Sequence, residues 1–226
     1  MRSHEKPRGI FLGNTLRGIL VGMTKTLWII IGCIVIALAA YFLFRNKDSM
    51  ITNFPPMQGP IVAFGDSLVF GYGASMGNDF VSVLEKQTGR EIINMGINGN
   101  TTADGLARID TVTALKPSVV LVLLGGNDFL RKVPATETFK NLNEIVEKLQ
   151  ANGAVVIVLG IQGGVLNDPF ASQFEALAHE RGTGYVPNVL AGMIGNQSLM
   201  YDTIHPNDTG YKKIADKVLP VLQKVL

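Results

Sequence analysis

The sequence predicts an α/β fold in which helices cover both faces of a parallel sheet. Two observations carry this prediction. Short apolar runs rich in β-branched residues recur after residue 60, as expected for strands that are buried on both faces. Between these runs lie longer segments whose apolar residues repeat with helical period. Strands and helices that alternate in this way form parallel sheets, because each crossover helix packs back onto a face of the sheet.

The predicted elements follow one another from residue 61 to residue 225. Strands are expected over 61–64, 92–95, 119–124 and 155–159, with a weaker strand over 184–186. Helices are expected over 79–88, 103–115, 136–151, 169–181 and 209–225. Thr136 is a suitable N-cap for the third helix, and Asn152-Gly153 would end it. Active sites of such sheets form beyond the carboxyl ends of the strands, so functional residues are expected there.

An apolar run of 18 residues, 27–44, precedes these elements and contains no charged side chain. As a helix it spans about 27 Å, close to the ~30 Å hydrocarbon core of a bilayer. Trp28 and Tyr41 lie near its ends, where amphipathic rings favour the membrane interface. We therefore predict one transmembrane helix over 27–44, between a basic tail over 1–26 and a linker over 45–59. Residues 60–226 are then the globular domain.

The charge distribution orients this predicted anchor. Residues 1–48 carry seven basic and two acidic side chains, a net charge of +5. Most of the basic residues precede the apolar run, so the N-terminus is expected in the cytoplasm and the domain outside it. Ala37-Leu38-Ala39 leaves a cleavable signal peptide open as an alternative, in which case the domain is secreted.

Composition excludes several classes of function. Residues 49–226 carry 13 basic and 16 acidic side chains, a net charge of −3, which argues against a nucleic-acid partner, because such binding needs a clustered basic face. A single cysteine, Cys33, excludes an intrachain disulfide framework and a multi-cysteine metal site.

Four polar segments carry the chemistry. Three follow the first three strands, and the fourth lies before the last helix: Gly65-Asp66-Ser67-Leu68, Asn98-Gly99-Asn100, Gly125-Gly126-Asn127-Asp128 and Asp202-Thr203-Ile204-His205-Pro206. Each has a structural alternative, since glycine, aspartate and serine also favour turns, and Asn127 could cap a helix. Together they supply the parts needed for acyl transfer. Serine needs a neutral imidazole to take its proton, a carboxylate can orient that imidazole, and an oxyanion needs preorganised N–H donors.

These motifs, in this order, resemble those of the SGNH (GDSL-type) hydrolases, particularly the arylesterase/lysophospholipase/acyl-CoA thioesterase branch. The resemblance covers about residues 60–226 and implies a flavodoxin-like three-layer α/β/α sandwich with a five-stranded parallel sheet. It implies that Ser67 is the nucleophile, that His205 is the base and that Asp202 orients His205. It also assigns the oxyanion hole to the backbone N–H groups of Ser67 and Gly99 and to the side-chain amide of Asn127. No metal and no organic cofactor are implied.

The implied activity is that of a serine esterase, which hydrolyses carboxylic ester or thioester bonds through an acyl-enzyme. Lipid-type or small acyl esters, such as lysophospholipids or aryl esters, are the expected substrates, because a membrane anchor would hold the site near the bilayer. Several apolar residues lie in or beside the motif loops and are expected to line an acyl pocket, above all Leu68, Phe129 and Leu166. The others are Phe70, Tyr72, Leu130, Val165 and Phe170. Two alternatives stay open: a carbohydrate O-acetyl esterase that acts on envelope polysaccharide, and a catalytically idle binding protein with the same fold.

Overall fold

The structure is a computed structural model that describes residues 25, 27–36, 51–162 and 169–226. The chain divides into two units, 1–48 and 49–226. In the first unit, residues 27–36 form a helix. Within the described ranges, no helix has both the length and the apolar character needed to cross a membrane. Residues 37–44 of the predicted transmembrane helix lie outside the described residues.

The second unit contains a sheet of five parallel strands, as predicted. Their order in the sheet is β2-β1-β3-β4-β5, which is the flavodoxin order. Gly65, at the end of β1, pairs with Gly96 of β2 and Leu123 of β3, so three strands end at one edge of the sheet. The strands are β1 (Ile61–Gly65), β2 (Ile92–Gly96), β3 (Val119–Leu123), β4 (Val155–Leu159) and β5 (Gly184–Val186).

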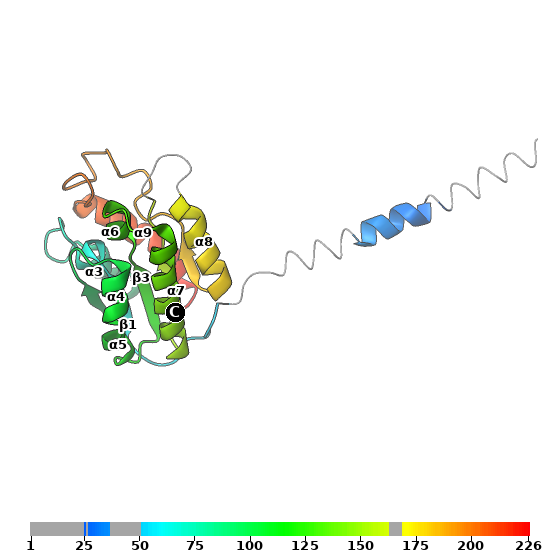
Figure 1. The fold of residues 1–226 in the computed structure, drawn as a ribbon, viewed down its shortest axis with the longest axis horizontal. Helices are drawn as coiled ribbons and strands as arrows, with labels where there is room; N and C mark the ends of the chain where they lie inside the picture. Colours follow the sequence, from blue (N-terminus) through cyan, green and yellow to red (C-terminus); the bar gives the residue numbers. More distant parts are fainter. Residues whose placement is uncertain (1–24, 26, 37–50, 163–168) are drawn as a thin grey trace, which may run out of the picture. The chain divides into compact units, whose positions relative to one another are not determined.

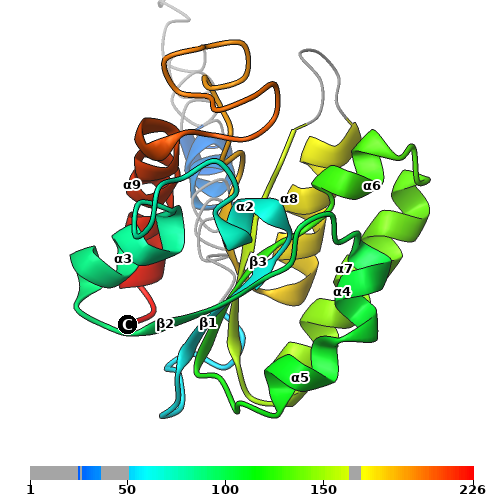
Figure 2. The same ribbon diagram turned by 90° about the vertical axis from the view of Figure 1, so that its left-hand side faces the viewer.

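Helices cover both faces of this sheet (Figures 1 and 2). Successive side chains of β1 enter different cores: Ile61 and Ala63 pack into one, Val62 and Phe64 into the other. The first core is closed by α3 (Phe80–Thr88) and α9 (Asp208–Gln223), and the second by α5 (Ile109–Thr113), α7 (Ala135–Ala151) and α8 (Pro169–Arg181). Burial on both faces explains why the central strands are continuous apolar runs.

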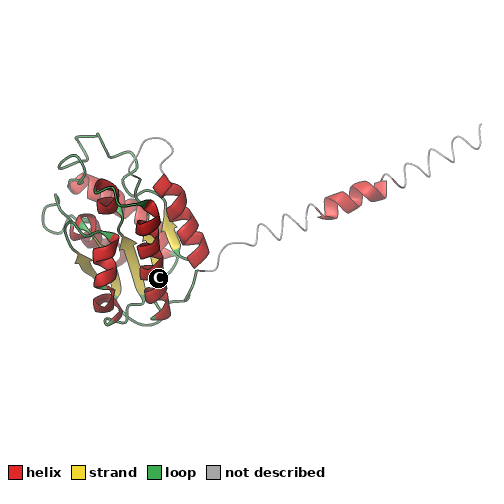
Figure 3. Cartoon of the chain, viewed as in Figure 1, coloured by secondary structure: helices red, strands yellow, loops and turns green. Residues whose placement is uncertain are grey.

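Several helices differ from their predicted bounds. The helix expected over 103–115 is two helices, α4 (Thr102–Ala107) and α5, which meet at Arg108. Pro134 occupies the N-cap position of α7, so the prediction that Thr136 caps this helix was wrong. Two short helices were not predicted: α2 (Ser67–Phe70) and α6 (Gly126–Leu130), which both lie at carboxyl ends of strands (Figure 2). Figure 3 distinguishes the helices from the strands by colour.

Part of the segment predicted as a linker packs on the globular unit. The Thr52 amide donates to the Gly182 carbonyl at 2.8 Å. The Asn53 side chain donates to the carbonyls of Gln150 and Ala154 at 2.8 and 3.0 Å. The packed domain therefore begins before residue 60.

Candidate active site

The turn between β1 and α2 presents Ser67 at the edge of the sheet. Asp66 is the N-cap of α2, and its carboxylate accepts a hydrogen bond from the Leu68 amide at 3.0 Å. Gly65 is required at the end of β1, because a Cβ there would lie 2.3 Å from the Leu123 carbonyl oxygen and 2.4 Å from a Val69 methyl. Gly71, with φ of 89°, ends α2 after one turn. The serine therefore lies at a tight strand-to-helix turn, beyond the carboxyl end of β1.

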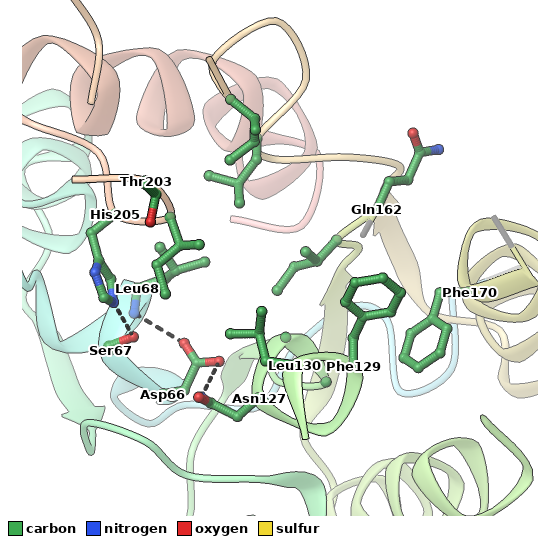
Figure 4. Close-up of a pocket in the computed structure, with 16 residues that line it drawn as sticks. Asp66, Ser67, Leu68, Asn127, Phe129, Leu130, Gln162, Phe170, Thr203 and His205 are labelled. Carbon is green, nitrogen blue, oxygen red and sulfur yellow. Dashed lines mark hydrogen bonds between the residues drawn. The ribbon is translucent and has the colours of Figure 1, made fainter. Parts of the chain in front are cut away.

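A chain of hydrogen bonds links Ser67 to two residues from the end of the sequence. Ser67 Oγ lies 3.0 Å from His205 Nε2, and His205 Nδ1 lies 2.7 Å from Asp202 Oδ2. Figure 4 shows His205 pointing at Ser67 beside the cavity described below. The structure thus brings together the three residues that the resemblance implied as nucleophile, base and orienting carboxylate.

The loop around Asp202 holds this carboxylate toward the imidazole. Asp202 Oδ1 accepts hydrogen bonds from the backbone amides of Ile204 and His205 at 2.9 and 2.7 Å, so the other oxygen faces Nδ1. Burial raises the pKa of the Asp202 carboxyl, but the hydrogen bonds from His205 and Ile204 outweigh it and leave the pKa below its ordinary value. Asp202 is therefore ionised at neutral pH and can orient the Nδ1–H of His205.

The predicted oxyanion donors lie on loops that contact one another. Gly99 has φ of 78°, a conformation that favours glycine, and its carbonyl accepts from Arg131 at 2.8 Å. The Asn127 amide nitrogen donates to the Asn100 carbonyl at 3.0 Å and to Asp66 Oδ2 at 3.4 Å. Asn127 lies inside α6 and not at its N-cap, which is Gly125, so the capping alternative does not apply. The geometry leaves Asn127 one weak contact, the one to Asp66, that a stronger acceptor could replace.

A buried carboxylate that sequence reasoning did not single out ties these loops together. Asp128, 1% exposed, accepts from the backbone amide of Thr102 at 2.8 Å and from its hydroxyl at 2.5 Å. Asn141 of α7 donates to the same hydroxyl at 3.2 Å. Because Asp128 follows Asn127 and Thr102 lies at the start of α4, the pair holds α6 against the loop that contains Gly99.

Asp66 is a second buried carboxylate at the site. Burial, joined by the nearby Asp128 carboxylate, raises the pKa of Asp66 to about 7, although the hydrogen bonds from Leu68 and Asn127 lower it. Its neutral and charged forms therefore both occur near neutral pH.

An apolar cavity of about 150 Å³ opens beside Ser67 and His205 (Figure 4). Four of the predicted acyl-pocket residues line it: Leu68, Phe129, Leu130 and Phe170. Phe70 and Tyr72 are not among its lining residues, and Val165 and Leu166 lie outside the described residues. Further lining side chains were not singled out from the sequence, although Ile161 and Gln162 follow β4 and the strand-end rule could have found them. The others come from the long loop before α9: Leu190, Ile194, Thr203 and Ile204. Among the residues that the structure describes, no three or more His, Cys, Asp or Glu side chains are grouped so that they could hold a metal ion.

Known proteins match this chain across the domain that holds the site. The family model of the GDSL-like Lipase/Acylhydrolase family matches residues 63–213. Esterase TesA of Pseudomonas aeruginosa is 33% identical over 178 residues, which cover 74% of this chain and 89% of TesA. Thioesterase 1/protease 1/lysophospholipase L1 of Escherichia coli K12 is 30% identical over 175 residues, which cover 74% of this chain and 84% of that protein. A crystal structure of TesA aligns with a TM-score of 0.69, over 74% of this chain and 99% of the TesA chain, at 33% identity. The chain is a serine ester hydrolase and belongs to the GDSL-like lipase/acylhydrolase family.

Proposed function

We propose that the enzyme hydrolyses carboxylic esters through an acyl-enzyme on Ser67, with His205 as general base and acid and Asp202 as the orienting carboxylate. The hydrogen-bonded chain from Ser67 Oγ through the imidazole to Asp202 carries this proposal. Both contacts have the geometry that a serine nucleophile and its base require.

The reaction has two halves. His205 Nε2 takes the hydroxyl proton while Ser67 Oγ attacks the carbonyl carbon, and the same proton then passes to the alcohol oxygen as the C–O bond breaks. Water then replaces the alcohol beside His205, loses a proton to Nε2 and attacks the acyl carbon. The bond from this carbon to Ser67 Oγ breaks, Nε2 returns the proton to Oγ, and the acid is released. Asp202 favours the imidazolium that forms in each half, because it accepts the Nδ1–H.

The oxyanion is stabilised by the backbone N–H groups of Ser67 and Gly99 and by the Asn127 amide. Asn127 turns one N–H from Asp66, its 3.4 Å partner, to the oxyanion and keeps its 3.0 Å contact with the Asn100 carbonyl. This exchange is favourable in the transition state, because the oxyanion is a stronger acceptor than a partly protonated carboxyl group.

The substrate class follows from the cavity beside Ser67. Its walls are mainly aliphatic and aromatic, with Phe129, Leu130 and Phe170 on the side opposite His205 (Figure 4). Such a wall binds an acyl chain longer than acetyl, because each buried methylene contributes roughly 0.8 kcal/mol. Lysophospholipids, aryl esters and thioesters share this acyl portion, and two relatives are described as an esterase and as a thioesterase/lysophospholipase.

The test is ester hydrolysis by wild type and Ser67→Ala on p-nitrophenyl esters from acetate to decanoate. We expect the variant to lose activity by about 10⁴-fold or more on every ester, and wild type to prefer chains longer than acetyl. Equal activity of the two proteins would exclude Ser67 as the nucleophile. Equal inactivity would favour the idle binding protein, and a preference for acetate would favour a sugar O-acetyl esterase.

We also propose that residues 27–44 anchor the enzyme in a membrane, with the N-terminus in the cytoplasm and the catalytic domain on the other side. The uncharged run and its basic N-terminal flank support this location. Secretion after cleavage near residue 39 is the alternative that a shortened mature chain would support.

A further inference from the structure

An open groove of about 670 Å³ adjoins the catalytic loop. We call it the tyrosine groove; it is lined by residues 72–75, Tyr201, Asn207 and Asp208. The Tyr72 ring packs against the His205 ring, with centroids 4.6 Å apart, and His205 also lines the acyl cavity. The groove and the acyl cavity therefore adjoin the same imidazole.

This position faces the alcohol portion of an ester. In the proposed reaction, the acyl chain occupies the apolar cavity, and His205 Nε2 donates a proton to the alcohol oxygen as it leaves. The alcohol must therefore lie next to His205, and a substituent on it extends past the imidazole to Tyr72. The groove is the concave surface within reach of that substituent.

The walls of the tyrosine groove present aromatic surface. Tyr72 and Tyr201 are 42% and 62% exposed, and their rings lie nearly perpendicular, at 81°, with centroids 6.0 Å apart. Both are held in place. The buried Tyr211 hydroxyl donates to the Tyr72 carbonyl at 2.8 Å, and Tyr201 packs so closely on Gly73 that a Cβ there would lie 2.8 Å from the Tyr201 Cβ.

The charged groups at this groove are acidic. The Asp208 carboxylate accepts from the amide and hydroxyl of Ser75 at 2.7 and 2.6 Å, and these bonds hold its pKa below the ordinary value. Asp202 directly follows Tyr201. No Lys or Arg is among the described residues that line the groove; Lys86, outside the lining, donates its ammonium to the Gly77 carbonyl. The ionised carboxylate of Asp208 therefore attracts a cation to this groove.

Exposed tyrosine rings next to carboxylates are suited to a quaternary ammonium group, because a cation is attracted to the negative face of an aromatic ring. We propose that the tyrosine groove binds a quaternary ammonium group on the alcohol portion of the substrate, so that choline-type esters are preferred to uncharged esters of the same shape. The preference rests on the proposed function, because His205 must act on an alcohol that lies between the two sites.

The test compares butyrylcholine with 3,3-dimethylbutyl butyrate, in which carbon replaces the charged nitrogen. The full chain in non-ionic detergent is assayed as wild type, Tyr201→Leu and Tyr201→Phe, with methyl butyrate as a substrate whose alcohol portion is too short to reach the groove. We expect wild type to favour butyrylcholine about 10-fold in kcat/KM, in line with a cation on exposed aromatic rings. Tyr201→Phe keeps this ratio, because it keeps the ring, and Tyr201→Leu lowers it to about one.

Hydrolysis of methyl butyrate should be the same in all three proteins, because its alcohol portion is too short to reach the Tyr201 side chain. If wild type hydrolyses butyrylcholine and 3,3-dimethylbutyl butyrate with equal kcat/KM, the proposal is overturned. It is also overturned if Tyr201→Leu loses the same fraction of activity on these two esters, because that result indicates an apolar alcohol site. If Tyr201→Leu does not fold, the wild-type ratio decides.

Binding of choline, measured by calorimetry, separates failure of the groove from failure of the proposed function. We expect binding on the order of 1 mM in wild type and Tyr201→Phe, weakened at least about fivefold in Tyr201→Leu. If no ester is hydrolysed but choline binds in this pattern, the proposed function fails and the groove stands. If p-nitrophenyl butyrate is hydrolysed through Ser67 but choline does not bind, the groove assignment is wrong and the esterase stands.

Discussion

Asp66 shows how one side chain can serve both the fold and the site. Its Oδ1 caps α2 through the Leu68 amide, and its Oδ2 contacts the Asn127 amide that is proposed to bind the oxyanion. It is 2% exposed, and an ionised carboxylate so deeply buried is costly. The turn that presents Ser67 therefore contains a carboxyl group whose charge depends on pH near neutrality.

The raised pKa of Asp66 predicts a dependence of stability on pH. Because the folded pKa of about 7 lies above the unfolded value of 3.8, the folded state binds more protons between these values. The stabilisation is fully present below about pH 4 and is lost as the pH rises through 7, by at most about 4 kcal/mol. Asp66→Asn cannot ionise and keeps an acceptor for Leu68, so it should lack this loss. Urea unfolding of residues 49–226 between pH 4 and pH 8, in wild type and in Asp66→Asn, measures this loss of stability.

Asp79→Asn is the matched control for this measurement. Asp79 also caps a helix, α3, by accepting from the Ser82 amide at 3.0 Å, but it is only partly buried. The difference in the free energy of unfolding between wild type and Asp79→Asn should not show the pH dependence that is expected for Asp66→Asn. Parallel pH curves for wild type and Asp66→Asn would mean that Asp66 does not titrate in this range in the folded protein.

At the scale of secondary-structure elements, the contact between α4 and α6 links the two residues proposed as oxyanion donors, Gly99 and Asn127. Asp128 of α6 holds the first turn of α4 through Thr102, and Thr101 at the N-cap of α4 forms a capping box with Asp104. The loop that contains Gly99 is thereby fixed at its exit, and Asn127 is fixed beside it. We infer that this contact sets the spacing between the two donors.

Asp128→Ala should therefore lower kcat more than it raises KM. The change leaves the buried Thr102 amide without its acceptor, which costs roughly 1–3 kcal/mol of stability. If the proposed oxyanion donors are no longer held at a fixed spacing, kcat should fall by about 10-fold or more, because removal of one such donor lowers kcat by about 10²–10³-fold. Steady-state kinetics on p-nitrophenyl butyrate, at a temperature where the variant is folded, give both constants.

Asp110→Ala tests whether any loss of an aspartate near α4 has this effect. Asp110 lies in the first turn of α5, and its side chain is exposed. It should change neither kcat nor KM. If Asp128→Ala leaves kcat unchanged while its stability falls, the buried contact supports the fold and not the spacing of the donors.

These elements also show what the sequence could predict. The three central strands, β1, β3 and β4, were found because burial on both faces makes them apolar runs. Helices α2 and α6 were missed, since four or five residues are too few to reveal a helical period. The break at Arg108 depends on contacts with distant residues: its guanidinium donates to the Gly65 carbonyl, 43 positions away, and lies 4.2 Å from the centroid of the Phe64 ring. No local pattern reports such contacts.

At the scale of the whole molecule, the parallel sheet explains why three of the four motifs that the sequence indicated lie close together. Strand ends meet at one edge, so motifs that follow β1, β2 and β3 must lie close together, whatever their separation in sequence. The cavity walls were less predictable, because Leu190, Ile194 and Ile204 come from a loop without strand or helix signals. The order of the motifs predicts the type of reaction, whereas the loops between the motifs form the walls of the cavity that would bind the substrate.

The location of the enzyme is a property of the whole chain and gives the last prediction. If residues 27–44 are an uncleaved anchor with the N-terminus inside, the full chain should remain with membranes after a carbonate wash. Protease added to spheroplasts should then digest residues 49–226, because the +5 charge of residues 1–48 keeps only the short tail in the cytoplasm. A chain that begins at residue 49 should stay in the cytoplasmic fraction and resist the protease until lysis, which controls for leakage.

Protection of the full chain until lysis would mean that the orientation is the reverse of the proposed one, and a soluble domain outside the spheroplasts would support cleavage. Because an anchored domain meets substrates at the bilayer surface, retention of the full chain in membranes would also favour lipid esters over soluble ones.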